Sequence, residues 1–239
     1  MTKDNHSDAD PSLLVIVPAR RGSKRLPGKN RRTLAGATLL SRTIATVRAA
    51  DISAPCLLTT DDPAIAEAGE QAGFQVPFLR PADLSGDAAR TEDAVLHALD
   101  WYREDRGADP EMLLMLQITS PLRSAQSLRA GLKRLRDDAE IDAVLGVKML
   151  NRNPRQVFMS DPTGALRPLA SSNDPLLTAN GAIYLIRTAV FRAHGSFVPA
   201  RTVGIAMDQI ESIDIDTELD WRTAEAACEL IATDTGTEC

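Results

Sequence analysis

The sequence predicts an α/β fold, in which a mostly parallel sheet is covered by helices on both faces. Residues 13–17 form a continuous apolar run rich in β-branched side chains, which is typical of a strand buried on both faces. Similar short runs recur at 56–58, 112–116 and 143–147, and stretches with helical periodicity separate them. With 239 residues, of which 44% are hydrophobic, the chain is long enough for one substantial core.

Strands and helices are expected to alternate along the chain. Apolar residues between 39 and 47 repeat at helical spacing and predict the first helix. Asp62 directly precedes Pro63, which is the pattern of an N-cap followed by a proline at the first helical position. Such βα units place ligands outside the carboxyl ends of the strands. Further strands are expected at 76–79, 182–186 and 203–207, and further helices at 94–102, 128–135 and 224–231.

This alternation breaks between residues 150 and 179. Turn residues there surround only a short apolar segment at 157–159, which predicts a small insertion. We therefore expect a core made of residues 13–149 and 180–232, preceded by a disordered polar tail at 1–12. The tail lacks the apolar centre of a signal peptide, and no apolar run has transmembrane length, so no membrane association is expected.

Composition excludes several other classes of protein. Cys56, Cys228 and Cys239 show no C-x-x-C spacing and predict no disulfide framework, which indicates a reducing cytoplasm. The three histidines lack the H-x-x-x-H spacing of a zinc hydrolase. A net charge of -6 and the absence of aromatic residues before Phe74 argue against a nucleic-acid partner.

The first predicted strand leads into a loop of glycines, prolines and cations. Residues 20–32 hold seven basic side chains, and no acidic residue occurs between Asp10 and Asp51. In a chain of net charge -6, this local inversion predicts a site for a polyanionic ligand. The alternative is a solvated basic surface without a ligand.

The loop matches neither common phosphate-binding motif. Gly22 and Gly28 are separated by five residues, and Asn30 follows Lys29 where a Walker A loop has Ser or Thr. No G-x-G-x-x-G follows the strand, so a dinucleotide fingerprint is absent from the sequence too. Any metal ion must therefore be held elsewhere in the chain.

Asp214 and Asp216 are the candidates for holding that metal ion. They are two residues apart in an apolar context that we expect to be a strand, so both carboxylates project from one face. Carboxylate oxygens completed by substrate phosphates are the ligands that Mg²⁺ prefers. In the alternative interpretation, Asp216 only caps a helix that begins near Thr217.

Residues 15–30 resemble the N-terminal signature of the CMP-sialic acid synthetases, the acylneuraminate cytidylyltransferases. They read Val-Ile-Val-Pro-Ala-Arg-Arg-Gly-Ser-Lys-Arg-Leu-Pro-Gly-Lys-Asn. The related Kdo cytidylyltransferases resemble the chain less, because they carry Pro where Asn30 stands and lack its Ile-Asp-Ile-Asp run. The resemblance continues in family order over nearly the whole chain, through blocks at 59–61, 79–84, 116–123, 180–184 and 212–220.

This resemblance implies a Rossmann-like nucleotidyltransferase fold in which residues 150–179 form a dimerisation insertion of a homodimer. It also implies the reaction: CTP activates a sialic or sialic-like nonulosonic acid, with Mg²⁺ as cofactor, to give the CMP-sugar and pyrophosphate. Two alternatives remain open. One is a cytidylyltransferase for another acidic acceptor, such as legionaminic acid, Kdo or a phosphonate, and the other is a non-catalytic nucleotide-binding homologue.

The resemblance assigns roles to residues in three groups. The catalytic groups that stabilise charge are Arg20, Lys24, Lys29, Asp214 and Asp216, the last two as metal ligands. The nucleotide is expected at Ala19, Arg20, Ser23, Asn30, Arg80, Ala89 and Thr91. The sugar is expected at Gln117, Asn180, Tyr184 and Phe197. By residue type alone, Arg80 is equally consistent with a surface arginine, and Tyr184 and Phe197 with core residues.

The chain also departs from the family pattern at three places. The family usually has Pro where Ile118 stands, Arg where Thr178 stands, and a longer segment in place of residues 171–177. The last two departures fall in the acceptor region, where a lost guanidinium removes a bidentate ligand for a carboxylate. We therefore expect a remodelled acceptor site, with Arg155 from a partner subunit as the first candidate to replace that ligand.

Overall fold

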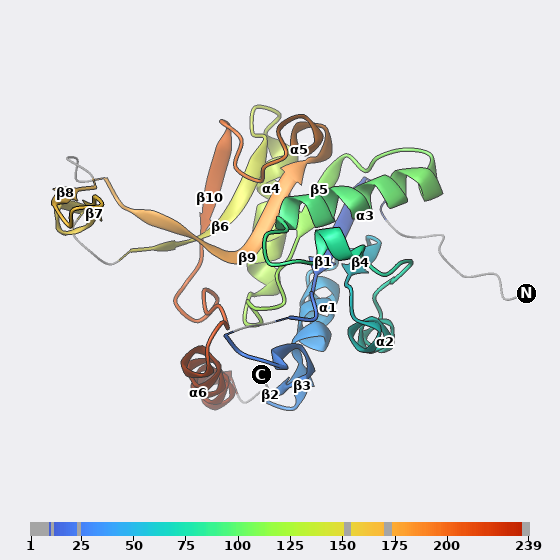
Figure 1. Ribbon diagram of the computed structural model, residues 1–239, viewed down its shortest axis with the longest axis horizontal. Coiled ribbons are helices and arrows are strands. Elements are labelled where there is room, and N and C mark those ends of the chain that lie inside the picture. The colour runs from blue at the N-terminus through green and yellow to red at the C-terminus, as the bar shows by residue number, and fades with distance from the viewer. Residues whose placement is uncertain (1–9, 11, 23–24, 151–153, 170–173, 236–239) are drawn as a thin grey trace, which may run out of the picture.

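A six-stranded sheet forms the centre of the fold in a computed structural model that describes residues 10, 12–22, 25–150, 154–169 and 174–235 (Figure 1). The strand order is β10-β6-β9-β5-β1-β4. Every strand is parallel to the others except β9, which runs antiparallel to both neighbours, β5 and β6. The predicted α/β class with a mostly parallel sheet is confirmed. The strands are β1 (Leu13–Pro18), β4 (Cys56–Thr59), β5 (Met112–Met115), β6 (Ala143–Met149), β9 (Leu177–Arg187) and β10 (Thr202–Ala206).

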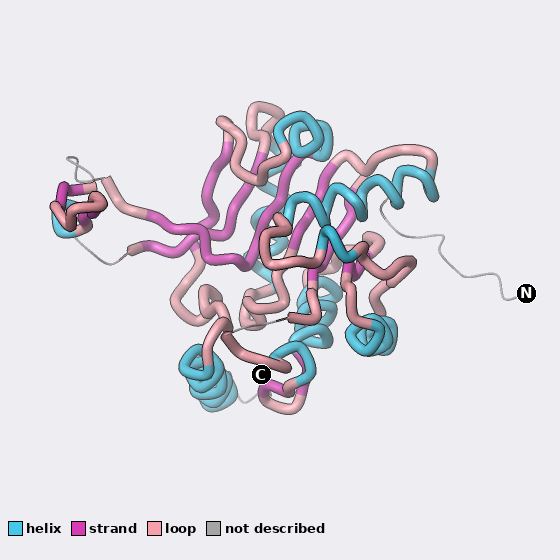
Figure 2. The backbone as a smooth tube through the Cα atoms, in the orientation of Figure 1, coloured by secondary structure: helices cyan, strands magenta, loops and turns pink. Residues whose placement is uncertain are grey.

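Helices cover both faces of this sheet (Figures 1 and 2). The alternation of β1 separates two cores, because Val15 and Val17 face one cluster while Leu14 and Ile16 face the other. Helices α1 and α4 pack in the first cluster, and α3 and α5 pack in the second. The helices are α1 (Leu39–Ala49), α2 (Pro63–Ala72), α3 (Thr91–Arg106), α4 (Ala125–Asp137), α5 (Thr188–His194) and α6 (Glu218–Thr235).

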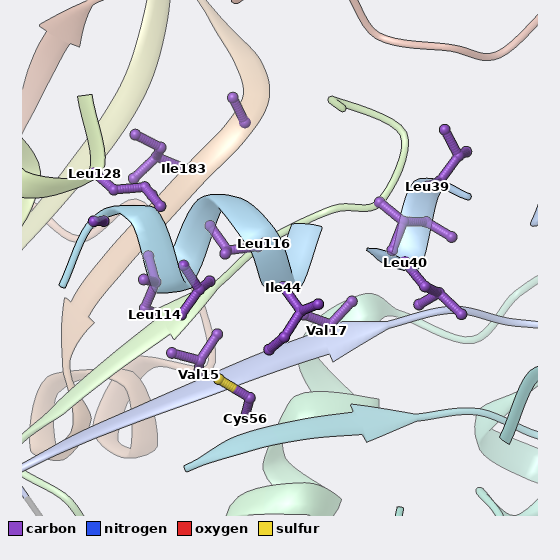
Figure 3. Packing of buried hydrophobic residues seen from close by; sticks show 14 of the residues in the cluster. Val15, Val17, Leu39, Leu40, Ile44, Cys56, Leu114, Leu116, Leu128 and Ile183 are labelled. Atoms are coloured by element: carbon purple, nitrogen blue, oxygen red, sulfur yellow. The ribbon is translucent and has the colours of Figure 1, made fainter. Parts of the chain in front are cut away.

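Figure 3 shows how the first cluster is filled. Ile44 of α1 lies over the strand residues Val15 and Val17, and Leu114 of β5 packs beside them. Cys56 of β4 lies at the edge of the same group and is a buried free thiol. Burial raises the pKa of this thiol to about 12, so it is a packing residue and not a nucleophile.

Two local predictions have opposite outcomes. Asp62 caps α2 as expected, since its side chain accepts a hydrogen bond of 2.8 Å from the Ala64 backbone N–H. The strand predicted at 76–79 is wrong. Only Gln75 makes a single bridge, to Leu57, and Pro77 then removes a donor that a further strand would need.

Residues 154–169, which lie within the predicted insertion at 150–179, form an arm that Figure 1 shows beyond the ends of β6 and β9. Within it β7 (Phe158–Ser160) pairs antiparallel with β8 (Leu166–Pro168), after a short 3₁₀ turn, η3 (Pro154–Gln156). The central sheet continues further than expected, because the β6–β9 ladder includes the pairs Lys148 with Thr178 and Met149 with Leu177. Large apolar side chains are exposed on and beside the arm, namely Met149, Phe158, Met159, Leu166, Leu169 and Leu177.

Shorter elements complete the chain. The 3₁₀ turns η1 (Lys29–Arg31) and η2 (Ala82–Leu84) lie in loops, and β2 (Thr33–Leu34) pairs with β3 (Ala37–Thr38). Among the described residues, no helix is both long and apolar enough to cross a membrane. The predicted tail at 1–12 lies almost entirely outside the described residues.

Helix α6 is anchored by Trp221, so we predict that Trp221→Ala lowers the free energy of unfolding by about 3–5 kcal/mol. The Trp221 side chain is fully buried, and the Arg32 guanidinium lies 4.0 Å from the centroid of its ring. Denaturant unfolding followed by circular dichroism measures the change. Leu230→Ala on the same helix is the control, because that side chain is 59% exposed and its loss should change stability by less than about 0.5 kcal/mol. Equal losses in the two variants would contradict this account of α6.

Candidate active site

The loops after β1 and β5 meet at the carboxyl ends of these parallel strands, together with the segment from Arg80 to Thr91 and the segment that precedes α6. They surround a cavity of about 560 Å³. This is the end of the sheet where ligands bind in open α/β folds. The structure thus brings most of the predicted site residues to one place. The predicted residues that line the cavity are Ala19, Arg20, Lys29, Asn30, Arg80, Ala89, Thr91, Gln117, Asp214 and Asp216.

Lys29 connects the basic loop to the acidic segment. Its ammonium group donates to the Ile215 carbonyl oxygen at 2.8 Å and lies 3.2 Å from Asp216 Oδ1. The side chain is only 9% exposed, so Lys29 is a buried cation and not part of a solvated surface. Burial of an ammonium group is favourable only with such partners. Lys29 therefore stabilises the site as well as giving it charge.

Asn30 holds the other side of the loop. Its Nδ2 donates to the Arg20 carbonyl oxygen at 2.9 Å, while Oδ1 is buried and has no hydrogen-bond partner among the described residues. The Ala19 N–H donates to Thr59 at the end of β4, which fixes the start of the loop. Ser23 and Lys24 lie outside the described residues, so their predicted roles remain predictions.

Asp214 has an unsatisfied oxygen at the cavity. Asp214 Oδ1 is buried and without a hydrogen-bond partner among the described residues. Burial raises the pKa of the Asp214 carboxyl, and the charge of Asp216 adds to this, against a hydrogen bond from Thr119 that lowers it. An orphaned carboxylate oxygen of this kind is a site for a cation or for a donor on a ligand.

The alternative role of Asp216 as a helix cap is wrong. Thr217 and Asp220 form the cap of α6 instead: the Asp220 carboxylate accepts from the Thr217 N–H at 2.7 Å, and the Thr217 hydroxyl accepts from the Asp220 N–H at 3.3 Å. Asp216 faces the cavity, where Arg25 Nη2 lies 2.6 Å from its Oδ2. The expectation of a strand is also wrong, since residues 213–216 belong to no strand, although the Ile215 N–H donates to Thr119.

The two acidic side chains suit a divalent cation held partly by a substrate. Among the described residues, no group of three or more His, Cys, Asp or Glu side chains could hold a metal ion. Two carboxylates, one with an orphaned oxygen, fit the mode in which Mg²⁺ binds through one or two carboxylates and completes its shell with phosphates and water.

Arg80 is buried at the cavity, which is unusual for an arginine. Its Nε and Nη2 have no hydrogen-bond partner among the described residues, and Nη2 lies 3.6 Å from Asp61 Oδ1. Burial lowers the pKa of Arg80, against the attraction of Asp61. The surface interpretation of Arg80 is therefore wrong, and its free donors are available to a ligand at the cavity.

Gly181 brings β9 close to the loop after β5. Its φ of +79° is left-handed, and a Cβ there would lie 3.0 Å from Gln117 Oε1 and 3.2 Å from Ser120 Oγ. Arg123 is buried beneath the same loop and donates from Nη2 to the Gln117 carbonyl oxygen. Glycine at 181 and arginine at 123 together fix where Gln117 enters the cavity.

The predicted sugar residues other than Gln117 do not line this cavity. The Asn180 side chain is buried and satisfied within the protein: Nδ2 donates to Ser212 Oγ at 2.9 Å, and Oδ1 accepts from Ala182 N–H. Phe197 is a core residue, 5.4 Å from the Tyr184 ring between centroids. Tyr184 is half-buried, and burial, with smaller effects of Asp214 and Glu92, raises the pKa of its hydroxyl. Tyr184 and Phe197 therefore form an aromatic pair that does not line the cavity.

Several residues that sequence reasoning missed belong to the site. Arg25 and Arg90 line the cavity, and Arg123 and Gly181 position its walls. The seven cations in residues 20–32 included Arg25, but nothing in the sequence said which of them would turn inward. The glycine of the Asn-Gly-Ala block was visible, but its positive φ was not.

A cytidylyltransferase family model matches residues 14–217. The chain belongs to the cytidylyltransferase family. It is 32% identical to CMP-N,N'-diacetyllegionaminic acid synthase of Legionella pneumophila, over 91% of this chain and 97% of that protein. It is 27% identical to an N-acylneuraminate cytidylyltransferase of Streptococcus agalactiae, over 87% of this chain but only 51% of that longer protein.

Solved structures confirm the nucleotidyltransferase fold of this cytidylyltransferase. The structure of a CMP:2-keto-3-deoxy-manno-octonic acid synthetase complexed with CTP matches with a TM-score of 0.68. The match covers 93% of this chain and 99% of that one, at 17% identity. Membership of the cytidylyltransferase family makes the protein an enzyme of the nucleotidyltransferase class.

We predict that Gly181→Ala lowers both stability and turnover, because the new methyl group meets Gln117 and Ser120 in a left-handed backbone conformation. The conformation alone costs about 1–2 kcal/mol. Gly107→Ala is a matched control, since Gly107 has the same φ of +79° but nothing lies within 4 Å of the position of a Cβ. The control should lose only the conformational part of the stability and keep full turnover, as measured by thermal unfolding and initial rates. Equal effects in both variants would contradict the role of Gly181 at the cavity.

Proposed function

We propose that this cytidylyltransferase transfers CMP from CTP to a sialic or sialic-like nonulosonic acid. The observation that carries the proposal is one cavity lined by five cationic residues and by the carboxylates of Asp214 and Asp216. The names of the Legionella and Streptococcus relatives support an acidic nine-carbon sugar as the acceptor. N,N'-diacetyllegionaminic acid is the first acid to test, because the relative named for it shares the higher identity of the two.

In the proposed reaction the anomeric hydroxyl oxygen of the acid attacks the α-phosphorus of CTP. The bond from that phosphorus to the bridging oxygen breaks, pyrophosphate leaves, and the hydroxyl proton passes to solvent. The protein contributes alignment and charge, since phosphoryl-type transfer needs little covalent chemistry from side chains. Lys29 and Arg20 would meet phosphate oxygens, with Lys24 and Ser23 of the same loop as further candidates.

Mg²⁺ is the proposed cofactor, with Asp214 and Asp216 as the residues that would hold it. When bound, it would polarise the α-phosphate and make the sugar hydroxyl easier to deprotonate. Asp216 is paired with Lys29 and Arg25. We propose that the triphosphate takes over these two cations, which leaves the Asp216 carboxylate available at the same time.

We further propose a homodimer in the cytoplasm. The arm exposes Phe158 and Leu166 on a two-stranded hairpin that buries little by itself, so a second copy of the chain is the proposed cover for it. Sedimentation with Phe158→Ser and Leu166→Ser tests the dimer. The Cys56 thiol, which forms no disulfide, supports a reducing compartment.

Pyrophosphate release from CTP tests the reaction itself, with N,N'-diacetyllegionaminic acid, N-acetylneuraminic acid and Kdo as acceptors and with the CMP-sugar identified by mass spectrometry. Rapid formation of CMP-diacetyllegionaminate or CMP-neuraminate supports the proposal. No CMP-sugar from any of the three acids would contradict the proposal. A preference for Kdo would contradict the proposed acceptor class, the sialic-like nonulosonic acids.

We predict that Asp214→Asn and Asp216→Asn each lower kcat on the order of 10²-fold or more, because each removes a metal ligand without a change in volume. The Mg²⁺ concentration for half-maximal rate should rise, and Mn²⁺ binding in the presence of CTP, followed by electron paramagnetic resonance, should weaken. Asp105→Asn, at an exposed position on α3, is the control. Near-normal rates and Mn²⁺ binding in both site variants would refute the metal assignment.

Arg20 and Lys29 are predicted to differ in one respect. Both Arg20→Ala and Lys29→Ala should raise KM for CTP, with a dependence on ionic strength that reflects lost phosphate contacts. Only Lys29→Ala should also lower the thermal midpoint, since the Arg20 side chain is 43% exposed and the Lys29 side chain is 9% exposed. Unchanged CTP kinetics in both variants would mean that the loop is a solvated basic surface.

A further inference from the structure

Arg90 lies at the cavity and also contacts the segment that leads to the aromatic pair of Tyr184 and Phe197. It lines the cavity between Ala89 and Thr91, at the start of α3. Its Nη2 donates to the Gly195 carbonyl oxygen at 2.9 Å, and Gly195 is two residues before Phe197, which packs on Tyr184. We propose that the Arg90 guanidinium binds the carboxylate of the acidic acceptor. This inference rests on the proposed function, which supplies an acceptor with a carboxylate.

A 2-keto acid sugar requires a cation beside its carboxylate when it binds next to the α-phosphate. The carboxylate and the attacking anomeric hydroxyl are on the same carbon, so an unpaired carboxylate would enter the site beside the negative α-phosphate. A guanidinium matches a carboxylate with two parallel hydrogen bonds and cannot lose its proton at working pH. Thr178 supplies no such charge.

The other cationic residues among those that line the cavity in the described part of the chain face different partners. Arg25 and Lys29 lie at Asp216, at the end proposed for phosphate and metal. Arg20 and Arg80 each lie near an acidic side chain. Arg20 is 3.6 Å from Asp87, and Arg80 is 3.6 Å from Asp61. Among these five, Arg90 alone contacts the segment around Gly195, which leads to Phe197.

Arg90 has donors left for a ligand. Its side chain is 59% exposed, and the nearest carboxylate, Glu92 Oε2, lies 3.7 Å from Nε, which is beyond hydrogen-bond distance. Exposed pairs of this kind contribute little and rearrange readily. Within the described residues, Nη1 donates no hydrogen bond. The existing bond from Nη2 to Gly195 holds the guanidinium at the mouth of the cavity.

The surroundings of Arg90 favour an anion. Arg90 is the N-cap of the 16-residue helix α3 and makes no side-chain cap, so the first N–H groups of the helix add positive potential there. Independently of that helix end, the buried Arg80 guanidinium lines the same cavity with Nε and Nη2 unpartnered in the described part of the chain. The cavity therefore contains hydrogen-bond donors whose partners a ligand must supply.

The test compares N,N'-diacetyllegionaminic acid with its neutral methyl ester in the full-length enzyme, in the variants Arg90→Gln and Arg90→Lys. The native enzyme should prefer the acid over the ester. Arg90→Gln should reduce kcat/KM for the acid by roughly ten- to a hundredfold and should leave kcat/KM for the ester nearly unchanged, so that the preference is lost. Arg90→Lys should recover part of it, and KM for CTP should stay within about twofold.

Two controls separate the outcomes. Arg103→Gln on the exposed face of the same helix should change neither ratio. Lys148→Gln removes the exposed lysine that pairs with Thr178 across the β6–β9 ladder. If Lys148→Gln loses the preference for the acid and Arg90→Gln keeps it, the lysine beside the arm binds the carboxylate and the inference is wrong. An unchanged preference in Arg90→Gln, or an equal rise in KM for CTP and acid, also overturns it.

Failure of the proposed function has a different signature. It appears as absent turnover of every acid by the native enzyme, whereas the Arg90 inference is read from acid against ester. Where turnover is absent, binding of the two compounds in the presence of CTP is compared by saturation-transfer NMR. Equal binding of acid and ester to the native protein would then overturn the Arg90 inference, and a preference for the acid that Arg90→Gln removes would support it.

Discussion

The contact of the Lys29 ammonium group with Ile215 and Asp216 is the interaction on which the rest of the site depends. It joins residues that are 186 positions apart in the chain, from the loop after the first strand to the segment before the last helix. The same two segments are joined again by Arg32, which lies 2.6 Å from Glu218 and over the ring of Trp221. Because the basic loop and the acidic segment come from opposite ends of the sequence, neither is a site until the whole domain has folded.

Electrostatics explain why this site is poised for a charged ligand. Asp214 and Arg80 are both buried, and both keep polar atoms without partners in the described part of the chain. Such atoms cost free energy in a folded protein and persist where function requires them. Asp216, by contrast, is paired with two cations of the loop. A nucleotide with a divalent cation would bring both signs of charge together, so it could satisfy the orphaned groups and replace the internal pairs in one event.

Much of this could be predicted from the sequence, since apolar runs and helical periodicity are local signals. Asp62 followed by Pro63 specifies a cap in any context, and the structure has one there. Features that depend on distant contacts were missed. The direction of β9 is set by its neighbours and not by its own residues, and the apolar alternation around Ile215 looked like a strand although no strand lies beside it. The strand expected at 76–79 failed because its proline outweighed its apolar residues.

The same difference between local signals and distant contacts applies to the site residues. Lys29 and Asp216 belong to motifs whose residue types already indicate charge chemistry, so the sequence identified them, although nothing in it showed that Lys29 is buried. Asn180 was identified by position in a block, but its amide hydrogen bonds to Ser212 and to the backbone of its own strand. A motif shows that a side chain matters without showing whether it faces the ligand or supports the wall behind it. Only the hydrogen-bond partners decide between these roles.

The two halves of the cavity are built differently, and this has a consequence for specificity. The side that carries Ala19, Lys29 and Gln117 follows the adjacent parallel strands β1 and β5, whose ends are fixed by the sheet itself. The side at residues 80–91 belongs to the segment that leads into α3, and Arg90 ties it to Gly195. A change in this second segment leaves the strand ends in place. The acceptor contact that we propose for Arg90 can therefore vary without a change in the geometry at the strand ends.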